Sequence, residues 1–310
     1  MERVTNGAIL PERFRGGVAA LGNFDGFHAG HQAVVGRALA IARERSVPAL
    51  VASFAPHPAR LFKPELPPFA LTMVSQRLDL LGAFGVDAAV MIPFTRELAA
   101  LPAETFVEQW LVRRLGLTGV VTGGDFTFGQ GRSGDVAQLA TLGDKHGFTA
   151  EVVQPVADST GVISSTRIRA LLRAADPDGA AGLLTRPFTV RGIVEHGAKL
   201  GRTLGFPTAN LRLGDYQRPA YGVYAVMVRL PGGVRVKGVA NLGIRPMIEP
   251  PEELLETWLM DWSGDLYGKT IEVELVAYLR PEAKLDGLEA LKVQIAADAD
   301  AARAVLAGQG

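Results

Sequence analysis

Residues 21–31 read LGNFDGFHAGH, and this stretch follows a short apolar run, Val18–Leu21, that has the length of a buried strand. A helical pattern begins after it, at about Gln32, and continues to Arg45. A strand that passes through a glycine-containing loop into a helix is the junction at which open parallel α/β sheets bind their ligands. Backbone N–H groups and the helix dipole point outward there and favour an anion. The stretch therefore predicts a doubly wound α/β fold with a phosphate site after its first strand.

The side chains of this loop fit a phosphate ligand. Its glycines allow the backbone to approach a phosphate closely, and His28 and His31, three residues apart, can share one face at a helix start. Two imidazoles can donate hydrogen bonds to phosphate oxygens as charge builds in a transition state. The alternatives are two structural histidines or a metal pair, and the metal pair is weaker because no third ligand is evident.

Outward from the loop, short apolar runs alternate with helical patterns. This alternation predicts crossover units, hence a parallel sheet with helices on both faces. The expected strands are Val18–Leu21, Ala49–Phe54, Ala88–Ile92, Gly119–Thr122 and Ala150–Val153, and the expected helices are Gln32–Arg45, Gln76–Phe84, Glu104–Leu115 and Asp135–Lys145.

The pattern changes after Leu172. The stretch ADPDGAAG is interpreted as a helix-poor connector, and short β-rich runs at about 8–12-residue spacing follow it, which favours an antiparallel sheet or barrel. A last helix is expected at Leu288–Leu306. The chain is thus predicted to form an α/β domain, residues 1–183, and a mostly β domain, residues 184–310. The β-rich runs are Phe188–Val194, Val223–Leu230, Val234–Val239 and Ile271–Leu279.

Composition narrows the function classes. The 310 residues contain no cysteine, which excludes disulfides, thiolate zinc sites and a cysteine nucleophile. The 32 basic and 32 acidic residues balance, which argues against a strong nonspecific nucleic-acid binder. No apolar run approaches the ~20 residues that span a bilayer, and the first residues lack the apolar core of a signal peptide. We expect a cytoplasmic protein, a monomer or weak homo-oligomer, with no membrane or nucleic-acid partner.

The second half carries its own candidate phosphate loop, GRTLGFPTAN, at residues 201–210. Thr208 and Asn210 are two residues apart, so they project from the same side if the chain is extended there. A hydroxyl and an amide oxygen suit Mg²⁺ and phosphate. From spacing alone, a turn with a following strand is the stronger interpretation.

The pattern Gly-x-Phe-Asp-x-x-His-x-Gly-His resembles that of the HxGH nucleotidyltransferase superfamily, whose members attack the α-phosphate of a nucleotide. ISSTRIR, residues 163–169, resembles the superfamily's second ATP motif, with hydroxyl and N–H donors at a helix start and the charge of Arg167 and Arg169. The alternative is an ordinary N-cap followed by surface arginines. The resemblance implies ATP contacts from Gly22, Phe24, Asp25, His28, His31, Ser164, Ser165, Thr166 and Arg167.

A second glycine pattern points elsewhere. Gly129, Gly131 and Gly134 match G-x-G-x-x-G, with Glu151 about 20 residues on, as in a dinucleotide fold. However, GGDFTF separates Thr122 from the first of these glycines, and the HxGH loop already occupies the first strand's turn. A dehydrogenase is therefore the weaker alternative.

The run GGDFTFGQGRSGD and the run SFAPHPARLF, residues 53–62, resemble substrate loops of prokaryotic bifunctional riboflavin kinase/FAD synthetases. Aromatic side chains on such loops could stack on an isoalloxazine ring, or they could be core residues. Asp125 is a candidate for a hydrogen bond to flavin or nucleotide. The aromatic candidates are Phe62, Phe126, Phe128 and, more weakly, Phe106.

The second half resembles riboflavin kinases through GRTLGFPTANL and then, in order, TRPF, GVYAV, ANLGIRP, LYGK and LRPEAKLDGLEALKVQI. The resemblance implies that Glu256 is the base. Without the resemblance, Glu256 is only one member of the acidic cluster Glu252, Glu253 and Glu256, and most such clusters lie on a solvated surface. It also implies a phosphate loop with Mg²⁺ at Thr208 and Asn210. Met247, Trp258 and Trp262 depart from the family pattern and leave the shape of the flavin pocket open. The loop residues are Gly201, Arg202, Gly205, Thr208 and Asn210.

The resemblance covers about residues 15–300 and implies one enzyme with two activities. The second domain would phosphorylate riboflavin with ATP to FMN, and the first would transfer AMP from ATP to FMN, giving FAD and pyrophosphate, both with Mg²⁺. Two alternatives stay open. One is an adenylyltransferase for another acceptor, such as pantetheine phosphate or nicotinate nucleotide, and the other is a flavin-binding or regulatory protein whose active sites have decayed.

Overall fold

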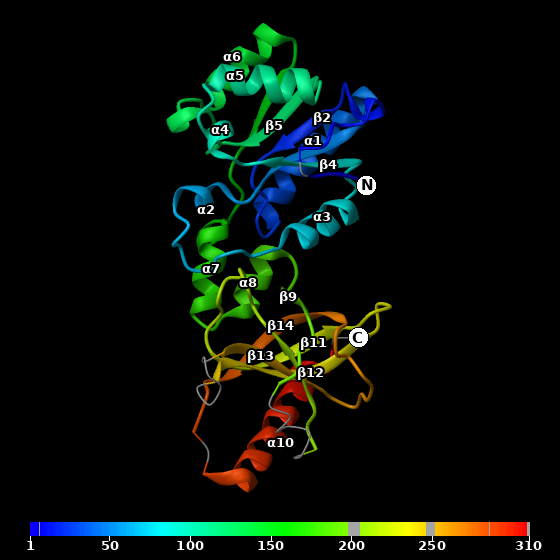
Figure 1. Ribbon diagram of the computed structural model, residues 1–310, viewed down its shortest axis with the longest axis vertical. Helices are drawn as coiled ribbons and strands as arrows, with labels where there is room; N and C mark the ends of the chain where they lie inside the picture. The colour runs from blue at the N-terminus through cyan, green and yellow to red at the C-terminus, as the bar shows by residue number, and fades with distance from the viewer. Residues whose placement is uncertain (6, 198–204, 246–251, 285, 309–310) are drawn as a thin grey trace. The chain divides into compact units, whose positions relative to one another are not determined.

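The computed structural model describes residues 1–5, 7–197, 205–245, 252–284 and 286–308. The chain divides into two compact units (Figure 1). Unit 1 contains Met1–Pro67 and Thr72–Ser164, and unit 2 contains Pro68–Leu71 and Ser165–Gly310.

Unit 1 is built on a six-stranded parallel sheet in the order β1-β4-β3-β2-β5-β6. The predicted strands are confirmed to within a residue. The apolar runs of β2, β3, β4 and β5 are buried on both faces, as expected for parallel strands, whereas β6 at the edge of the sheet is only partly buried. Only the short first strand was not expected. The strands are β1 (Glu2–Val4), β2 (Val18–Leu21), β3 (Ala49–Ala55), β4 (Ala88–Pro93), β5 (Gly119–Gly123) and β6 (Thr149–Val153).

Alternate strand residues point to opposite faces, and each face has its own apolar core. Helices α1 (Ala29–Arg45) and α3 (Val74–Ala83) pack with Val18, Ala20 and Val51 on one face. The other core joins Ala19, Leu21 and Leu50 to the remaining helices, so the predicted α/β class is confirmed. Those helices are α4 (Arg96–Ala99), α5 (Ala103–Phe106), the π-helical turn η2 (Val107–Arg114) and α6 (Val136–His146).

The remaining elements of unit 1 are short. Helix α2 (Pro58–Phe62) follows β3, the 3₁₀ turns are η1 (Glu12–Phe14) and η3 (Gln130–Arg132), and β7 (Ala157–Asp158) pairs with β8 (Gly161–Val162) in a small hairpin.

Unit 2 is built on a six-stranded antiparallel sheet in the order β10-β13-β12-β11-β14-β9. A bridge between Glu195, just after β9, and Asn210 on β10 links the two ends of this order, so the sheet curls as the predicted barrel requires. Helix α10 (Gly287–Val305) packs on one face through Ala299 and Ala302, which confirms the last predicted helix. The strands are β9 (Phe188–Ile193), β10 (Thr208–Leu211), β11 (Gly222–Arg229), β12 (Arg235–Arg245), β13 (Glu252–Leu259) and β14 (Thr270–Arg280).

The predicted helix-poor connector is wrong. Its residues form α8 (Pro177–Leu184), whose N-cap Asp176 accepts a hydrogen bond of 2.8 Å from the Gly179 N–H. Pro177 suits the first helical position, and Ala180, Leu183 and Leu184 are buried. The glycines and proline masked a short amphipathic helix, which contacts β9 and β14.

The compact units do not divide where the sequence composition changes. Helices α7 (Ser165–Arg173) and α8 contact each other within unit 2, and the Leu172 carbonyl accepts a 2.9 Å hydrogen bond from Ala220. Residues 68–71 also belong to unit 2, where Ala70 bridges to Tyr216.

Candidate active sites

The predicted site residues of unit 1 lie on loops at the carboxyl edge of the parallel sheet. The HxGH loop follows β2, α2 with Phe62 follows β3, and Asp125 follows β5. Phe94, which the sequence analysis did not single out, follows β4 directly. Because the carboxyl ends of parallel strands share one edge, four consecutive strand ends contribute to one region of unit 1.

The two histidines of the HxGH loop are held against each other. His28 is the N-cap of α1, its side chain accepts a hydrogen bond of 3.4 Å from the His31 N–H, and the two rings stack 3.7 Å apart between centroids. The ring of Phe24 meets His31 edge-on at 5.3 Å. The shared face is therefore confirmed, but the helix begins at Ala29, three residues before the predicted start.

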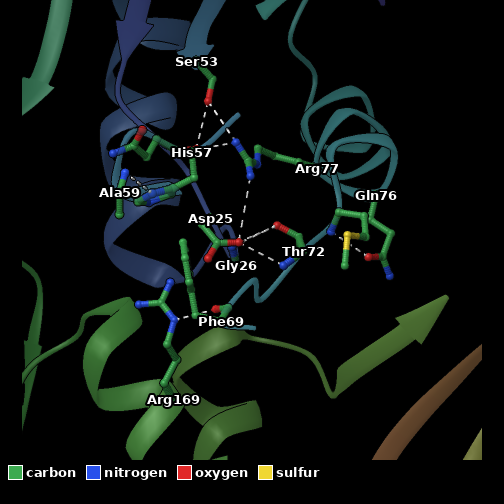
Figure 2. Close-up of polar contacts among 12 residues, drawn as sticks. Asp25, Gly26, Ser53, His57, Ala59, Phe69, Thr72, Gln76, Arg77 and Arg169 are labelled. Carbon is green, nitrogen blue, oxygen red and sulfur yellow. Dashed lines mark hydrogen bonds and ion pairs between the residues drawn. The ribbon is translucent and has the colours of Figure 1, made fainter. Parts of the chain in front are cut away.

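Beneath this loop lies a buried polar network (Figure 2). The Asp25 carboxylate accepts hydrogen bonds from the Thr72 N–H (3.0 Å) and Thr72 Oγ1 (3.3 Å), and it lies 3.9 Å from the Arg77 guanidinium. Arg77 also donates to the Asn23 carbonyl (2.8 Å) and to Ser53 Oγ (3.2 Å). Burial lowers the pKa of Arg77, and the nearby Asp25 carboxylate opposes that shift. Asp25 was predicted to contact ATP, whereas the contacts described here tie it to Thr72 and Arg77.

The second ATP motif spans the boundary between the units. Ser164 is the last residue of unit 1, and Ser165 opens α7 in unit 2. Thr166 is exposed and Arg167 is half-buried. Arg169 donates a 2.7 Å hydrogen bond to the Phe69 carbonyl and lies 5.3 Å from the centre of the Phe69 ring, so it has a structural partner inside unit 2 (Figure 2).

The aromatic candidates differ in exposure. Phe62 is 66% exposed and meets Phe94 edge-on at 6.0 Å, and Phe126 is half-buried and stacks on Phe128 at 5.7 Å. Phe128 and Phe106 are buried in the core, as the structural alternative expects for them. Asp125 is exposed in the turn after β5. The flavin roles of these residues stay predictions.

The G-x-G-x-x-G pattern has no dinucleotide geometry. Gly129 is separated from the end of β5, and the Phe128 and Gly134 backbones bridge each other around a 3₁₀ turn. Glu151 accepts a hydrogen bond of 2.9 Å from Arg37 on α1, so a structural ion pair occupies the acidic position.

In unit 2 the strand register brings the predicted kinase residues together. Thr208 and Asn210 lie on β10, opposite Trp258 and Glu256 on β13. Residues directly opposite in an antiparallel pair point to the same face, with Cβ atoms about 4.5–5.5 Å apart. The prediction that Thr208 and Asn210 share a side is confirmed. Asn241 on β12 lies opposite Glu256 on the other edge of β13. Asn241 was not singled out from the sequence, because the predicted strand ended at Val239 and no strand was predicted around Glu256.

The side chain of Asn210 has a buried oxygen that is available to a ligand. It is 4% exposed, and its Oδ1 has no hydrogen-bond partner within the part of the chain that the structure describes. A Cβ atom at Gly197 would lie 2.4 Å from the amide nitrogen of Asn210, so the glycine leaves room for this side chain. A buried amide oxygen without a partner is costly, and a cation or a bound donor would satisfy it. The residues present therefore fit a Mg²⁺ ion, although no group of three or more carboxylate or histidine side chains is gathered as a metal site among the described residues.

A pocket of about 270 Å³ opens beside these residues. Thr208, Asn210, Trp262 and Tyr267 line it, and the Tyr267 ring lies 3.9 Å from that of His196. Trp258 is half-buried and meets Phe206 edge-on at 4.9 Å. Gly205 adopts a positive φ of 89°, as a tight loop before β10 requires. The predicted phosphate-loop residues Gly201 and Arg202, and the variant position Met247, lie outside the described residues.

The two units thus define an enzyme that transfers phosphorus-containing groups, with a nucleotidyltransferase-type α/β domain and an antiparallel β domain. The family model of FAD synthetase matches residues 10–167, and that of riboflavin kinase matches residues 184–306. A bifunctional riboflavin kinase/FMN adenylyltransferase from Pseudomonas fluorescens is 43% identical over 300 residues, covering 96% of each chain. Its counterpart from Escherichia coli K12 is 40% identical over 288 residues, covering 93% of this chain and 92% of the relative.

This chain belongs to the bifunctional riboflavin kinase/FMN adenylyltransferase family, and it makes FMN from riboflavin and FAD from FMN. Both alternatives, another acceptor and a binding protein with decayed sites, give way to this assignment.

One solved structure extends the likeness to the fold of the whole chain. A Streptococcus pneumoniae protein described as a macrolide-efflux protein has a TM-score of 0.87 and 30% identity, covering 98% of this chain and 99% of that one. We take only the fold from this likeness. Among the described residues, no helix is long and apolar enough to cross a membrane.

Proposed function

We propose that ATP is the donor in both reactions, that Glu256 is the base of the kinase and that His28 and His31 act in adenylyl transfer. The observation that carries the proposal is the arrangement around Asn210. Its buried Oδ1 faces the same side of the sheet as Thr208, directly opposite Glu256 across the strand pair. This arrangement supports binding of a cation or phosphate group next to the Glu256 carboxylate, which is only partly buried.

In the kinase, Glu256 takes the proton of the terminal ribityl hydroxyl while that oxygen attacks the γ-phosphorus of ATP. The bond from the γ-phosphorus to the bridging oxygen breaks, which leaves ADP and FMN. Thr208 and Asn210 hold Mg²⁺, which neutralises phosphate charge when bound. Gly205, with Gly201 and Arg202, forms the phosphate loop.

In the adenylyltransferase, the FMN phosphate oxygen attacks the α-phosphorus of a second ATP, and pyrophosphate leaves. His28 and His31 hydrogen-bond the phosphate oxygens as charge builds, and their stacked arrangement at the start of α1 supports this role. Backbone of Gly22 and the Phe24–Asp25 turn shape the ATP site, with Ser164, Ser165, Thr166 and Arg167 as further ligands. Asp125, Phe62, Phe126 and Phe128 form the flavin side.

The functional boundary is placed between residues 183 and 184, which agrees with the start of the riboflavin kinase match at residue 184. The protein acts on small molecules in the cytoplasm, where ATP is supplied, as a monomer or weak homo-oligomer and without nucleic acid.

Flavin chromatography tests the proposal. The protein is incubated with riboflavin, ATP and Mg²⁺, and riboflavin, FMN and FAD are separated over time. His31→Ala is expected to lower FAD formation by about 10³-fold and to leave FMN formation unchanged, because the histidine serves one reaction. Glu256→Gln is expected to lower FMN formation by about 10³-fold while supplied FMN is still converted to FAD.

The two variants are each other's control. Equal loss of both products in either variant would contradict the division of labour between the units. A Glu256→Gln enzyme with a normal kinase rate would mean that another group accepts the proton. If either reaction keeps its rate when ATP is omitted or is replaced by another nucleotide, ATP is not the required donor of that reaction.

A further inference from the structure

An ion pair is buried beneath the HxGH loop, where no reacting group is expected. Arg77 on α3 is 4% exposed, and Asp25 in the loop is 3% exposed. Isolated buried charges are strongly unfavourable, and a well-packed apolar pair of similar size often stabilises a fold at least as well. A guanidinium at this position is therefore not explained by packing alone.

The contacts of Arg77 converge on the loop rather than on its own helix. Its NH1 donates to the Asn23 carbonyl at 2.8 Å and to Ser53 Oγ at 3.2 Å, while Ser53 Oγ donates to the same Asn23 carbonyl at 2.9 Å. Its NH2 lies 3.9 Å from Asp25 Oδ1. Figure 2 shows the guanidinium between Ser53 on β3 and Asp25 in the loop. One side chain thus fixes both a backbone carbonyl and a carboxylate of the loop.

Thr72 is a second residue that contacts the Asp25 carboxylate, at the same oxygen, Oδ1, that lies nearest Arg77. The Thr72 N–H and hydroxyl donate to Asp25 Oδ1, and its Oγ1 accepts a 3.0 Å hydrogen bond from the Gly26 N–H. Three of the four positions from 23 to 26, namely Asn23, Asp25 and Gly26, are therefore tied to groups far away in the sequence. Figure 2 shows the contacts of Asp25.

The loop needs such ties because its backbone is strained. Phe24 and Phe27 have φ angles of 51° and 43°, in a region that residues other than glycine rarely occupy. Gly26, between them, has a φ angle of 86°. Strained backbone persists where surrounding contacts over-determine it, and it gathers at functional sites. Phe27 leads directly into His28, so the conformation of the loop sets where both histidines stand.

We propose that Arg77 is a positioning residue of the adenylyltransferase, which holds residues 23–26 through Asp25 and the Asn23 carbonyl so that His28 and His31 meet the phosphates. Asp25 in this scheme acts through Arg77 and Thr72 rather than through a contact with ATP. The inference rests on the proposed role of the two histidines. It adds that their geometry, and not only their presence, is maintained by a buried cation on α3.

The test uses the full chain with Arg77→Met, Arg77→Lys and a matched control, Arg37→Met, which breaks the half-exposed Arg37–Glu151 pair in the same unit. Adenylyl transfer is measured as kcat and KM for ATP and FMN, well below the unfolding temperature. Riboflavin phosphorylation by the same preparation serves as the internal reference.

Arg77→Met is expected to lower kcat for adenylyl transfer about 10²-fold with KM changed little, because misplacement by about 1 Å costs that much in a preorganised site. Arg77→Lys keeps the charge and is expected to recover about tenfold of that loss. The kinase rate and the Arg37→Met enzyme are expected to stay within about twofold of the unmodified protein. A purely structural role would lower the unfolding temperature without this selective loss of kcat.

A folded Arg77→Met enzyme with normal kcat, or an Arg77→Lys enzyme no better than Arg77→Met, would overturn the inference. If Arg77→Met does not fold, Thr72→Val replaces it, since this change removes one contact of Asp25 and no charge. It is expected to lower kcat about tenfold, and an unchanged kcat would again overturn the inference. His31→Ala in the same assay separates the two levels. A normal rate there refutes the histidine role itself, whereas an inactive His31→Ala beside a normal Arg77→Met refutes only the positioning role.

Discussion

The two sites of this chain are built in opposite ways. In unit 1 the histidines stand on a loop with two phenylalanines at positive φ, and a buried network from β3, α3 and Thr72 holds that loop. In unit 2 Thr208, Asn210 and Glu256 stand on regular neighbouring strands, and the hydrogen-bonded register alone brings them to one face. A strand-built site follows from spacing, whereas a loop-built site needs support from distant residues.

The difference also decides which substitutions are damaging. On the strands, a residue's consequence depends on the face to which it points, because adjacent positions alternate between the site and the interior. Asn210 and Thr257 make this contrast sharp, since each has a buried polar oxygen with no hydrogen-bond partner within the described part of the chain. Asn210 lines the pocket, whereas Thr257 is opposite Ala209 and points to the other face of the sheet, with the Leu211–Leu255 pair two positions along.

Asn210→Ala is expected to have the largest effect, a drop of about 10³-fold in kcat/KM for riboflavin phosphorylation with a higher Mg²⁺ requirement, because a proposed cation ligand is lost. The measurement is the kinase rate as a function of Mg²⁺ concentration. FAD formation from supplied FMN is expected to stay unchanged in the same preparation.

Thr257→Val is the matched control, one residue along on the register of the same strand pair. It is expected to leave the kinase rate within about twofold and the free energy of unfolding equal or higher, because an unpartnered buried hydroxyl is replaced by a methyl of the same shape. If both variants lose activity alike, the face assignment, and with it the strand-built site, is wrong.

The boundary between the units gives the next prediction. A fragment that begins at Ser165 keeps α7 and α8, whereas one that begins at Leu184 loses the buried side chains of Ile168, Leu172, Ala180 and Leu183. The shorter fragment is expected to be less stable by about 3 kcal/mol, because several apolar side chains lose their packing in unit 2. Urea unfolding of both fragments measures the difference.

Both fragments lack residues 68–71, so that loss is the same in each. If the two fragments are equally stable, α7 and α8 do not stabilise unit 2. The domain boundary would then lie between residues 183 and 184, as proposed from the sequence. Kinase activity in the longer fragment alone would instead place the working boundary near Ser165.

The smallest effect on activity is expected for Phe62, the most exposed of the aromatic candidates in unit 1. Phe62→Ala is expected to raise KM for FMN by about five- to tenfold with little change in kcat, because a stacked ring adds modest affinity. Steady-state adenylyl transfer at varied FMN measures it. Ile9→Ala, which truncates another exposed apolar side chain of unit 1, serves as the control, and equal KM values for both variants would remove Phe62 from the flavin site.

Much of this molecule could be predicted from local pattern. The inner parallel strands of unit 1 were found because both of their faces are buried, and the shared face of Thr208 and Asn210 followed from their spacing. Helix α8 was missed because Pro177 and Gly179 read as a linker, although proline suits a first helical turn. Strand β13 was missed because Glu252, Glu253 and Glu256 resemble a solvated surface, while its pairing with β10 and β12 on both sides decided its structure.

The sequence by itself determined the α/β and antiparallel β classes, the HxGH and PTAN motifs and the residues proposed to carry the chemistry, because strand periodicity and loop composition are local properties. Only the tertiary structure decided what holds those residues. Arg77 lies 52 positions from Asp25 in the chain, and Asn241 lies 15 positions from Glu256, so no spacing rule links them. Burial favours pairing of the Arg77 guanidinium with the Asp25 carboxylate, and it makes an unpartnered Asn210 oxygen costly. These residues become buried only when the chain folds.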